Sequence, residues 1–204
     1  MSKPVLVIAG LGRCGSTMVM HMLAAGGQPC EGTPPAFEVE EAISIDRSWF
    51  NSLRGKAVKV LNPQHVGIPD DVPRRTIYLE RRVEEQAKSI CKMLSLGGGA
   101  PVPSSRYRRL MQNSLIRDNK TARALMRQPT GSNCTSQLLV MQFEEILAHP
   151  RESARKLAMM AMVDTFDIGA AAAVVQQRSP FCATDMAIEL QLTAAAAATQ
   201  EQTP

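Results

Sequence analysis

The sequence predicts an α/β fold, in which a central, mainly parallel sheet of four to five strands is flanked by helices in three layers. The first observation is the segment 5–9, a continuous apolar run rich in β-branched residues, which is typical of a strand buried on both faces. The second is that strand-like and helix-like segments alternate along the chain. This alternation is expected where crossover helices join parallel strands.

The other elements are placed by their apolar patterns and by the residues that end them. We expect strands at 5–9, 57–61, 76–79 and 137–142. We expect helices at 16–25, 37–53, 83–96, 104–127, 150–162 and 170–175, with Asp167 as the cap of the last one. One domain is expected over residues 1–192. The tail 193–204 is Ala-rich and then polar, and it is expected to be disordered.

The composition of the chain narrows the classes of function. With 204 residues, of which 45% are hydrophobic and 21% charged, the chain suits one globular domain and not a disordered chain or a coiled-coil rod. A net charge of +4 mildly suits an anionic ligand but does not by itself indicate a nucleic-acid binder, and with 4% aromatic residues no stacking platform for single strands is expected. We expect no membrane helix and no export signal, because the apolar runs are short and the first one stops at Gly10. The five cysteines form no CxxC pair and no zinc-like cluster, so reduced thiols, no metal and a cytoplasmic location are expected.

A glycine-rich turn follows the first strand. It reads Gly10-Leu-Gly-Arg-Cys-Gly-Ser-Thr17 and leads into a helix. Glycines let the backbone curl so that several N–H groups face one anion, and the positive end of the helix adds to this attraction. Arg13 supplies a permanent charge in a fork that suits phosphate or sulfate oxygens, and Ser16 and Thr17 add hydroxyl donors. The sequence therefore predicts an anion-binding loop.

This loop differs from the triphosphate-binding pattern GxxxxGK[ST], because its basic residue precedes the last glycine by two positions. It resembles the 5′-phosphosulfate-binding loop of the sulfotransferases, whose common form is Pro-(Lys/Arg)-Ser-Gly-Thr-Thr. Gly12 stands in place of the proline and Cys14 in place of the serine. The resemblance implies a P-loop fold and the donor 3′-phosphoadenosine 5′-phosphosulfate (PAPS). It also implies that the 5′-phosphosulfate is held by Arg13, Cys14, Gly15, Ser16 and Thr17.

A second motif agrees with this resemblance. In the family, an arginine at a strand end is followed eight residues later by a serine on the next helix, and the pair binds the 3′-phosphate of the donor. Arg81 and Ser89 have this spacing. The intermediate positions match at Glu85 and Ala87 and depart at Val83, where the family has a proline. An arginine fork and a hydroxyl together can clamp a terminal phosphate.

Weaker likenesses to bacterial and phage-type members occur at 32–38, 55–60 and 143–150, so that the resemblance spans about residues 4–178.

The resemblance also implies groups for the transfer step. Sulfuryl transfer needs a base for the proton of the acceptor and a cation for the leaving phosphate. Lys59 is the candidate cation, but the histidine that cytosolic relatives carry two positions later is replaced by Leu61. Glu38, in the segment after the first helix, is the first candidate base, with His65 and the weaker Glu31 as alternatives.

The sequence also allows predictions for Cys14 and His21, which lie in the loop and in the helix that follows it. Cys14 stands beside a helix N-terminus and Arg13, which predicts a lowered thiol pKa and sensitivity to oxidation. We do not expect it to act as a nucleophile, because direct sulfuryl transfer needs none. His21 lies among methionines of the first helix and is expected to be a packed residue, not a ligand.

The function predicted from these residues is transfer of a sulfuryl group from PAPS, without a metal, to a hydroxyl or amine. Two alternatives stay open. One is a P-loop kinase or NTPase that uses ATP and magnesium, and the other is a non-catalytic relative that binds a phosphorylated ligand. The acceptor, a small molecule or a polymer, is not specified by the sequence. Neither a specific nucleic acid nor a membrane is expected as a partner, and a homo-oligomer is left open.

Overall fold

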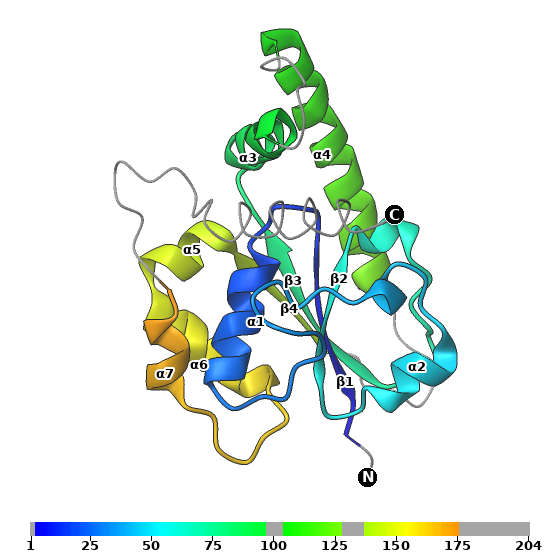
Figure 1. Cartoon of the computed structure of the whole chain (residues 1–204), viewed down its shortest axis with the longest axis vertical. Helices are drawn as coiled ribbons and strands as arrows, with labels where there is room; N and C mark the ends of the chain where they lie inside the picture. The colour runs from blue at the N-terminus through cyan, green and yellow to red at the C-terminus, as the bar shows by residue number, and fades with distance from the viewer. Residues whose placement is uncertain (1–2, 97–103, 128–136, 176–204) are drawn as a thin grey trace, which may run out of the picture.

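The structure is a computed structural model that describes residues 3–96, 104–127 and 137–175 (Figure 1). Its strands are β1 (Val5–Gly10), β2 (Ala57–Leu61), β3 (Arg74–Glu80) and β4 (Gln137–Gln142). Its α-helices are α1 (Ser16–Ala25), α2 (Arg47–Ser52), α3 (Val83–Leu96), α4 (Ser105–Met126), α5 (Phe143–Ala148), α6 (Pro150–Met160) and α7 (Ile168–Ala173). Two short 3₁₀ turns are η1 (Glu40–Ala42) and η2 (Pro63–His65). The expected tail 193–204 lies outside the described residues. Within the described ranges, no helix combines the length and the apolar character that crossing a bilayer requires.

The four strands of the described residues form one parallel sheet in the order β2-β1-β3-β4. This arrangement confirms the predicted fold class. From β1 the chain passes first to β2 on one side and then to β3 on the other side, so the strand order reverses at β1. Open α/β sheets bind ligands beyond the carboxyl ends of the strands at such a point. Gly10 lies level with Leu61 and Leu79, so three strand ends meet at this edge.

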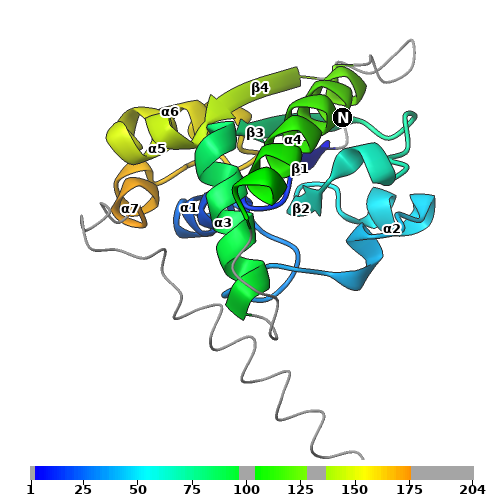
Figure 2. The same ribbon diagram turned by 90° about the horizontal axis from the view of Figure 1, so that it is seen from above.

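Helices cover both faces of the sheet, as Figures 1 and 2 show. On one face lie α1, α5, α6 and α7, and on the other lie α2, α3 and α4. Successive side chains of a strand point to opposite faces, so Leu6 and Ile8 pack with α1, whereas Val5 and Val7 pack with the α4 layer. All six residues of β1 are buried. A fully buried aliphatic side chain contributes about 1.5–3 kcal/mol, so the loop after β1 starts from a firmly anchored strand.

The segment 37–53 is not one helix, which corrects the expectation from its sequence. Phe37 has a left-handed φ of 54°, and Val39 is extended. The helical parts are therefore limited to η1 and α2. The α2 helix begins after Asp46, because the Asp46 carboxylate accepts two N–H groups of the first turn. Of the early acidic residues that suggested a helix start, Glu40 and Glu41 lie in the short η1 turn, Glu38 lies just before it, and all three are exposed.

A buried glutamine joins three segments at the edge of the sheet opposite the glycine loop. Gln28 is 2% exposed and follows α1. Its amide nitrogen donates to the carbonyl of Gly55 at 2.8 Å, and its amide oxygen accepts the N–H of Met162 at 2.8 Å. The side chain thus provides partners for backbone groups that burial would otherwise leave unsatisfied.

Gln28→Ala is expected to lower the free energy of unfolding by about 2–3 kcal/mol, because it leaves buried backbone groups without partners. Urea unfolding followed by circular dichroism measures the change. Gln137→Ala, at an exposed position, is the matched control and should change the free energy by less than about 0.5 kcal/mol. Equal losses in the two variants would contradict this role of Gln28.

Candidate anion-binding site

The glycine loop leaves the sheet at the carboxyl end of β1 and turns into α1. Gly15 precedes the helix with a left-handed φ of 98°, and no side chain caps the helix. A Cβ atom at Gly15 would lie 2.3 Å from the Phe143 ring, so glycine is required there by both conformation and space. The first N–H groups of an α-helix have no acceptor within the helix. Without a side-chain cap, they give the loop a positive end.

Three hydrogen bonds fasten the loop to the end of β3 and to α3. Arg81 Nη1 donates to the carbonyl of Arg13 at 3.0 Å, and Gln86 Nε2 donates to the carbonyl of Gly12 at 2.8 Å. Arg13 Nε in turn donates to Ser89 Oγ at 3.1 Å. The structure therefore brings the two sequence motifs into direct contact, with Arg13 from the first and Arg81 and Ser89 from the second.

Asn62 holds the loop from the opposite side. Its Oδ1 accepts the N–H of Gly12 at 3.2 Å, and its own N–H donates to the carbonyl of Gly10 at 2.9 Å. Asn62 and Gln86 thus fix Gly12 through both of its backbone polar groups. Sequence reasoning missed both residues. Asn62 is followed by a proline, a pattern that indicates only the end of a strand. Gln86 lies three residues before Ser89, so the two share one face of the helix, and this spacing could have indicated a role for Gln86.

The junction of β4 and α5 closes one side of the site. Phe143, the first residue of α5, lies against Gly15. Its ring centroid is 4.6 Å from the guanidinium carbon of Arg81, which is a cation–π contact. The neighbouring Glu144 carboxylate accepts the N–H of Arg82 at 3.1 Å. The orientation of Arg81 is therefore set by a carbonyl on one side and an aromatic ring on the other.

A second cation lies beside the start of α1. Lys59 of β2 is 3% exposed, and its Nζ donates to the Ala36 carbonyl, to Glu38 Oε1 at 3.1 Å and to Thr17 Oγ1 at 3.4 Å. Burial lowers the pKa of Lys59, and the Glu38 carboxylate opposes this effect. The Glu38 side chain is 67% exposed. A buried ammonium group and an accessible carboxylate are thus paired next to the loop.

The other two candidate bases lie on other segments, His65 after β2 and Glu31 before it. His65 is exposed in η2, which packs against α4, and its N–H donates to the carbonyl of Asn62 at 2.9 Å. Its use as a base stays a prediction. Glu31 pairs with Lys56 at 2.9 Å, just before β2 begins. Of the three candidate bases, the structure brings Glu38 into contact with Lys59 and leaves Glu31 at the opposite edge of the sheet.

Cys14 is not the reactive thiol that its position suggested. Its side chain is 1% exposed in the core that includes α1. This burial raises the pKa of Cys14 to about 11, and hydrogen bonds from Ser16 and the charge of Arg81 offset only part of the increase. The N–H of Cys14 donates to the carbonyl of Leu11 at 3.2 Å. Cys14 therefore stays protonated at neutral pH and stabilises the loop by packing.

His21 is packed, as the sequence predicts, and it contacts the segment that carries Glu38. Its Nε2 lies 2.8 Å from the carbonyl oxygen of Pro35. Its ring also meets the Phe37 ring edge-on, with centroids 4.9 Å apart. These contacts hold the segment before Glu38 against α1, which keeps the Glu38 carboxylate near Lys59.

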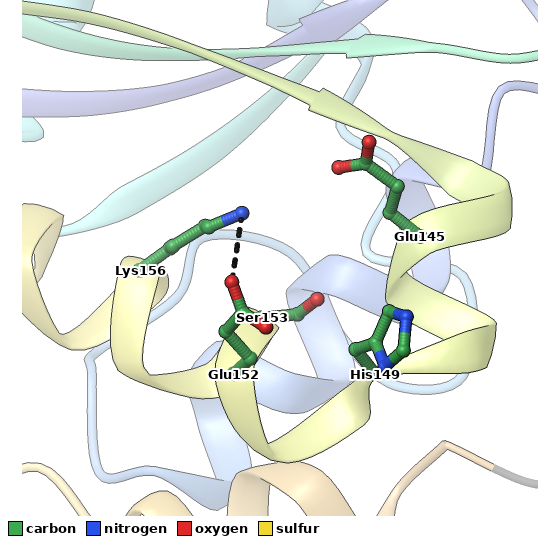
Figure 3. Close-up of a pocket in the computed structure, with 5 residues that line it drawn as sticks. All are labelled: Glu145, His149, Glu152, Ser153 and Lys156. Atoms are coloured by element: carbon green, nitrogen blue, oxygen red, sulfur yellow. Dashed lines mark ion pairs between the residues drawn. The ribbon is translucent and has the colours of Figure 1, made fainter.

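A separate pocket lies on the surface of α5 and α6 (Figure 3). It has a volume of about 230 Å³ and is lined by Glu145, His149, Glu152, Ser153 and Lys156. The ion pair drawn in Figure 3 joins Lys156 and Glu152 at 3.5 Å. Its lining includes neither the glycine loop nor α3. With two carboxylates and a single lysine, it is a poor match for a phosphate or a sulfate.

Comparison with known proteins supports the fold. No protein-family model matches the chain, and no curated protein matches its sequence. The structure is similar to the crystal structure of a sulfotransferase from Mycobacterium tuberculosis H37Rv, with a TM-score of 0.53 and 12% sequence identity. That similarity covers 88% of this chain and 72% of the mycobacterial one. The chain therefore has a sulfotransferase-like α/β fold.

Two other solved structures are less similar to this one. One is a sugar kinase from Janibacter sp. HTCC2649, with a TM-score of 0.40 and 13% identity over 85% of this chain and 99% of that chain. The other is retinol dehydratase in a complex with retinol and PAP, with a TM-score of 0.36 and 13% identity over 95% of this chain and 65% of that chain.

Gly15→Ala is expected to destabilise the protein by about 2 kcal/mol or more, because the new methyl group meets the Phe143 ring and the φ of 98° is unfavourable for alanine. Thermal unfolding measures this loss. Gly12→Ala is the control, since a Cβ atom there has no neighbour within 4 Å, and it should unfold within a few degrees of the unmodified protein. A stable Gly15→Ala variant would show that the loop can move away from Phe143.

Proposed function

We propose that the protein transfers a sulfuryl group from PAPS to a hydroxyl or amine of an acceptor. The observation that carries this proposal is the hydrogen-bonded cluster of Arg13, Arg81 and Ser89. It joins two anion-binding motifs at the carboxyl edge of neighbouring parallel strands, where α/β folds bind nucleotides. The Lys59 ammonium beside Thr17 adds a second cationic group at the start of α1, so a ligand with two anionic groups fits the site better than a ligand with one.

The hydrogen-bond donors and cations of the site fit such a ligand. Two arginine forks and a hydroxyl suit a phosphate, and they gather between the glycine loop and α3. The uncapped start of α1 and the Lys59 ammonium suit a second anionic group. In this proposal the 3′-phosphate lies at the α3 side and the 5′-phosphosulfate at the start of α1. The cationic groups of the chain neutralise the donor, so that the scheme requires no metal.

Lys59 and Glu38 are the residues that we assign to the transfer step. PAPS, when bound, supplies the electrophilic sulfuryl group. Lys59 holds a positive charge beside the Thr17 hydroxyl, where it stabilises negative charge that develops at the start of α1. Glu38 presents an exposed carboxylate, which an acceptor can reach and which can take its proton. The ion pair between Lys59 and Glu38 keeps the cation and the base together before substrates bind.

The first test uses the desulfated donor, 3′-phosphoadenosine 5′-phosphate (PAP). PAP is expected to bind in isothermal titration calorimetry and to raise the melting temperature more than ATP with magnesium does. Arg81→Ala should weaken PAP binding about 10- to 100-fold, the effect of one lost charge-assisted contact.

Arg155→Ala is the matched control, because it removes the same charge from an exposed position of α6. If PAP fails to bind, or if ATP with magnesium stabilises the protein more than PAP does, the proposed function is wrong.

The second test separates the function of Lys59 from its effect on stability. Lys59→Met should weaken PAPS binding about tenfold or more, while the free energy of unfolding stays constant or rises by about 1 kcal/mol, since a buried charge is removed. The pKa of Lys59 is below its ordinary value of 10.5 in the folded protein. As the pH rises toward 10.5, the unfolded chain therefore holds the Lys59 proton longer than the folded protein does, and the free energy of unfolding of the unmodified protein increases. Any difference by which Lys59→Met is the more stable protein should become smaller over the same range.

Lys56→Met is the control for this test. Lys56 precedes β2 and pairs with Glu31 at the surface, so neither PAPS affinity nor stability should change appreciably. A destabilised Lys59→Met variant with unaltered PAPS affinity would make Lys59 a structural residue only.

A further inference from the structure

We propose that the protein forms a two-fold dimer, in which the outer face of α4 of one copy binds the acidic segment 38–46 of the other copy. The two surfaces carry opposite charges, and each of them also exposes large aliphatic side chains. The inference goes beyond the proposed function and does not depend on it.

The outer face of α4 is a basic surface that runs along the whole helix. Buried residues, among them Leu115 and Met126, mark the side of α4 that packs on the sheet. An α-helix has 3.6 residues per turn, so the spacing of the remaining residues decides which of them lie on the opposite side. That side carries exposed cations at Arg106, Arg109, Arg117, Lys120 and Arg127. We call this surface the basic face.

Most cations of the basic face have no acidic partner in their own copy. Arg117 pairs with the adjacent Asp118 at 3.4 Å, and its side chain is 78% exposed. The other four make no ion pair within residues 3–96, 104–127 and 137–175.

Two aliphatic side chains accompany these cations. Leu110 is 60% exposed and Ile116 is 57% exposed, and both lie beside the basic face. Arginine and apolar side chains together are typical of a surface that binds protein. A lipid bilayer would instead need the apolar side of α4, which is buried against the sheet. The basic face therefore fits an acidic protein surface that also has an apolar part.

The segment 38–46 is such a surface. It contains four acidic residues and no basic residue. Glu40 and Glu41 are exposed, and in the part of the chain that the structure describes they make no ion pair. Ile43, in the same segment, is 75% exposed. The chain thus carries both an unpaired basic surface and an unpaired acidic surface, which makes a second copy the partner that fits each of them.

Both surfaces belong to the face of the sheet that α2, α3 and α4 cover (Figures 1 and 2). Val39 and Ile45 of the acidic segment pack in the same apolar cluster as Leu115 of α4. This common side allows one partner to meet both surfaces, so that two identical contacts related by a two-fold axis close the dimer. In such a dimer, α4 of the second copy lies against the segment that carries Glu38, next to the candidate site.

Analytical ultracentrifugation of the full chain tests the proposal at protein concentrations up to about 100 µM, a range that reveals micromolar dissociation constants. A monomer–dimer equilibrium is expected, and raising the salt concentration from about 0.05 M to about 0.5 M should shift it toward the monomer. The double variants Arg109→Glu/Lys120→Glu and Glu40→Lys/Glu41→Lys should each raise the dissociation constant about tenfold or more, because each places like charges opposite one another.

Arg151→Glu/Arg155→Glu is the matched control. Both arginines are exposed on α6, which covers the other face of the sheet. This double variant changes the net charge by the same amount as the reversal in α4 and should leave the dissociation constant unchanged.

An equimolar mixture of the two charge-reversed variants separates this pairing from a general effect of net charge. At positions 40, 41, 109 and 120, one variant carries only carboxylates and the other carries only cations, so each contact of a mixed dimer again joins opposite charges. The mixture should dimerise at concentrations at which neither variant does alone. Thermal unfolding identifies a variant that fails to fold, and the single substitutions Arg109→Glu and Glu41→Lys then give the same comparison.

Two results would overturn the inference. One is an unmodified protein that stays monomeric over the whole concentration range, which would leave the basic face to an acidic partner other than a second copy. The other is a mixture that dimerises no better than its two components, which would place the contact on other surfaces. Neither result bears on the proposed function, since PAP binding is measured on the monomer and on the dimer alike.

Discussion

The attachment of the glycine loop to α3 is the constraint on which the candidate site depends. A left-handed backbone is unfavourable for a residue with a side chain, and it persists only where neighbouring groups hold it. Arg13 has such a left-handed backbone, and Arg81 donates a hydrogen bond to the Arg13 carbonyl. One residue earlier, Gln86 and Asn62 bind the backbone carbonyl and N–H of Gly12. The hydrogen bonds turn a simple connection between β1 and α1 into a fixed surface shared with α3.

Apolar burial and polar contacts have different tasks in this arrangement. The fully buried β1 fixes where the loop begins, and a Cβ atom at Gly10 would approach the Leu79 carbonyl to 2.8 Å, so β1 and β3 are closely packed at their ends. Apolar packing is not directional, and it cannot by itself aim a guanidinium group. The direction of Arg81 comes from a carbonyl and from the Phe143 ring.

The sequence allowed the sheet and the glycine turn between β1 and α1 to be predicted, because each follows from local periodicity and glycine spacing. The joint role of Arg81 and Ser89 came from a family resemblance and stays a prediction. The direction of the Arg13 side chain could not be predicted, since it depends on a backbone angle that tertiary contacts hold. Likewise, the pKa of Cys14 depends on its depth in the core, which the neighbouring residues do not reveal. The expected helix over 37–53 failed because a run of acids resembles a helix start, whereas Asp46 starts the helix later.

Besides the packing of Phe37 and the His21 contacts, one ammonium group ties the segment before Glu38 to the sheet, because Lys59 binds both the Ala36 carbonyl and the Glu38 carboxylate. Dissolved ions weaken an attraction between charges when one of them is open to solvent, as Glu38 is. Ionic strength therefore weakens the Lys59–Glu38 part of this attachment, whereas the same ions leave the packing of Phe37 and the apolar layers on either side of the sheet largely unaffected.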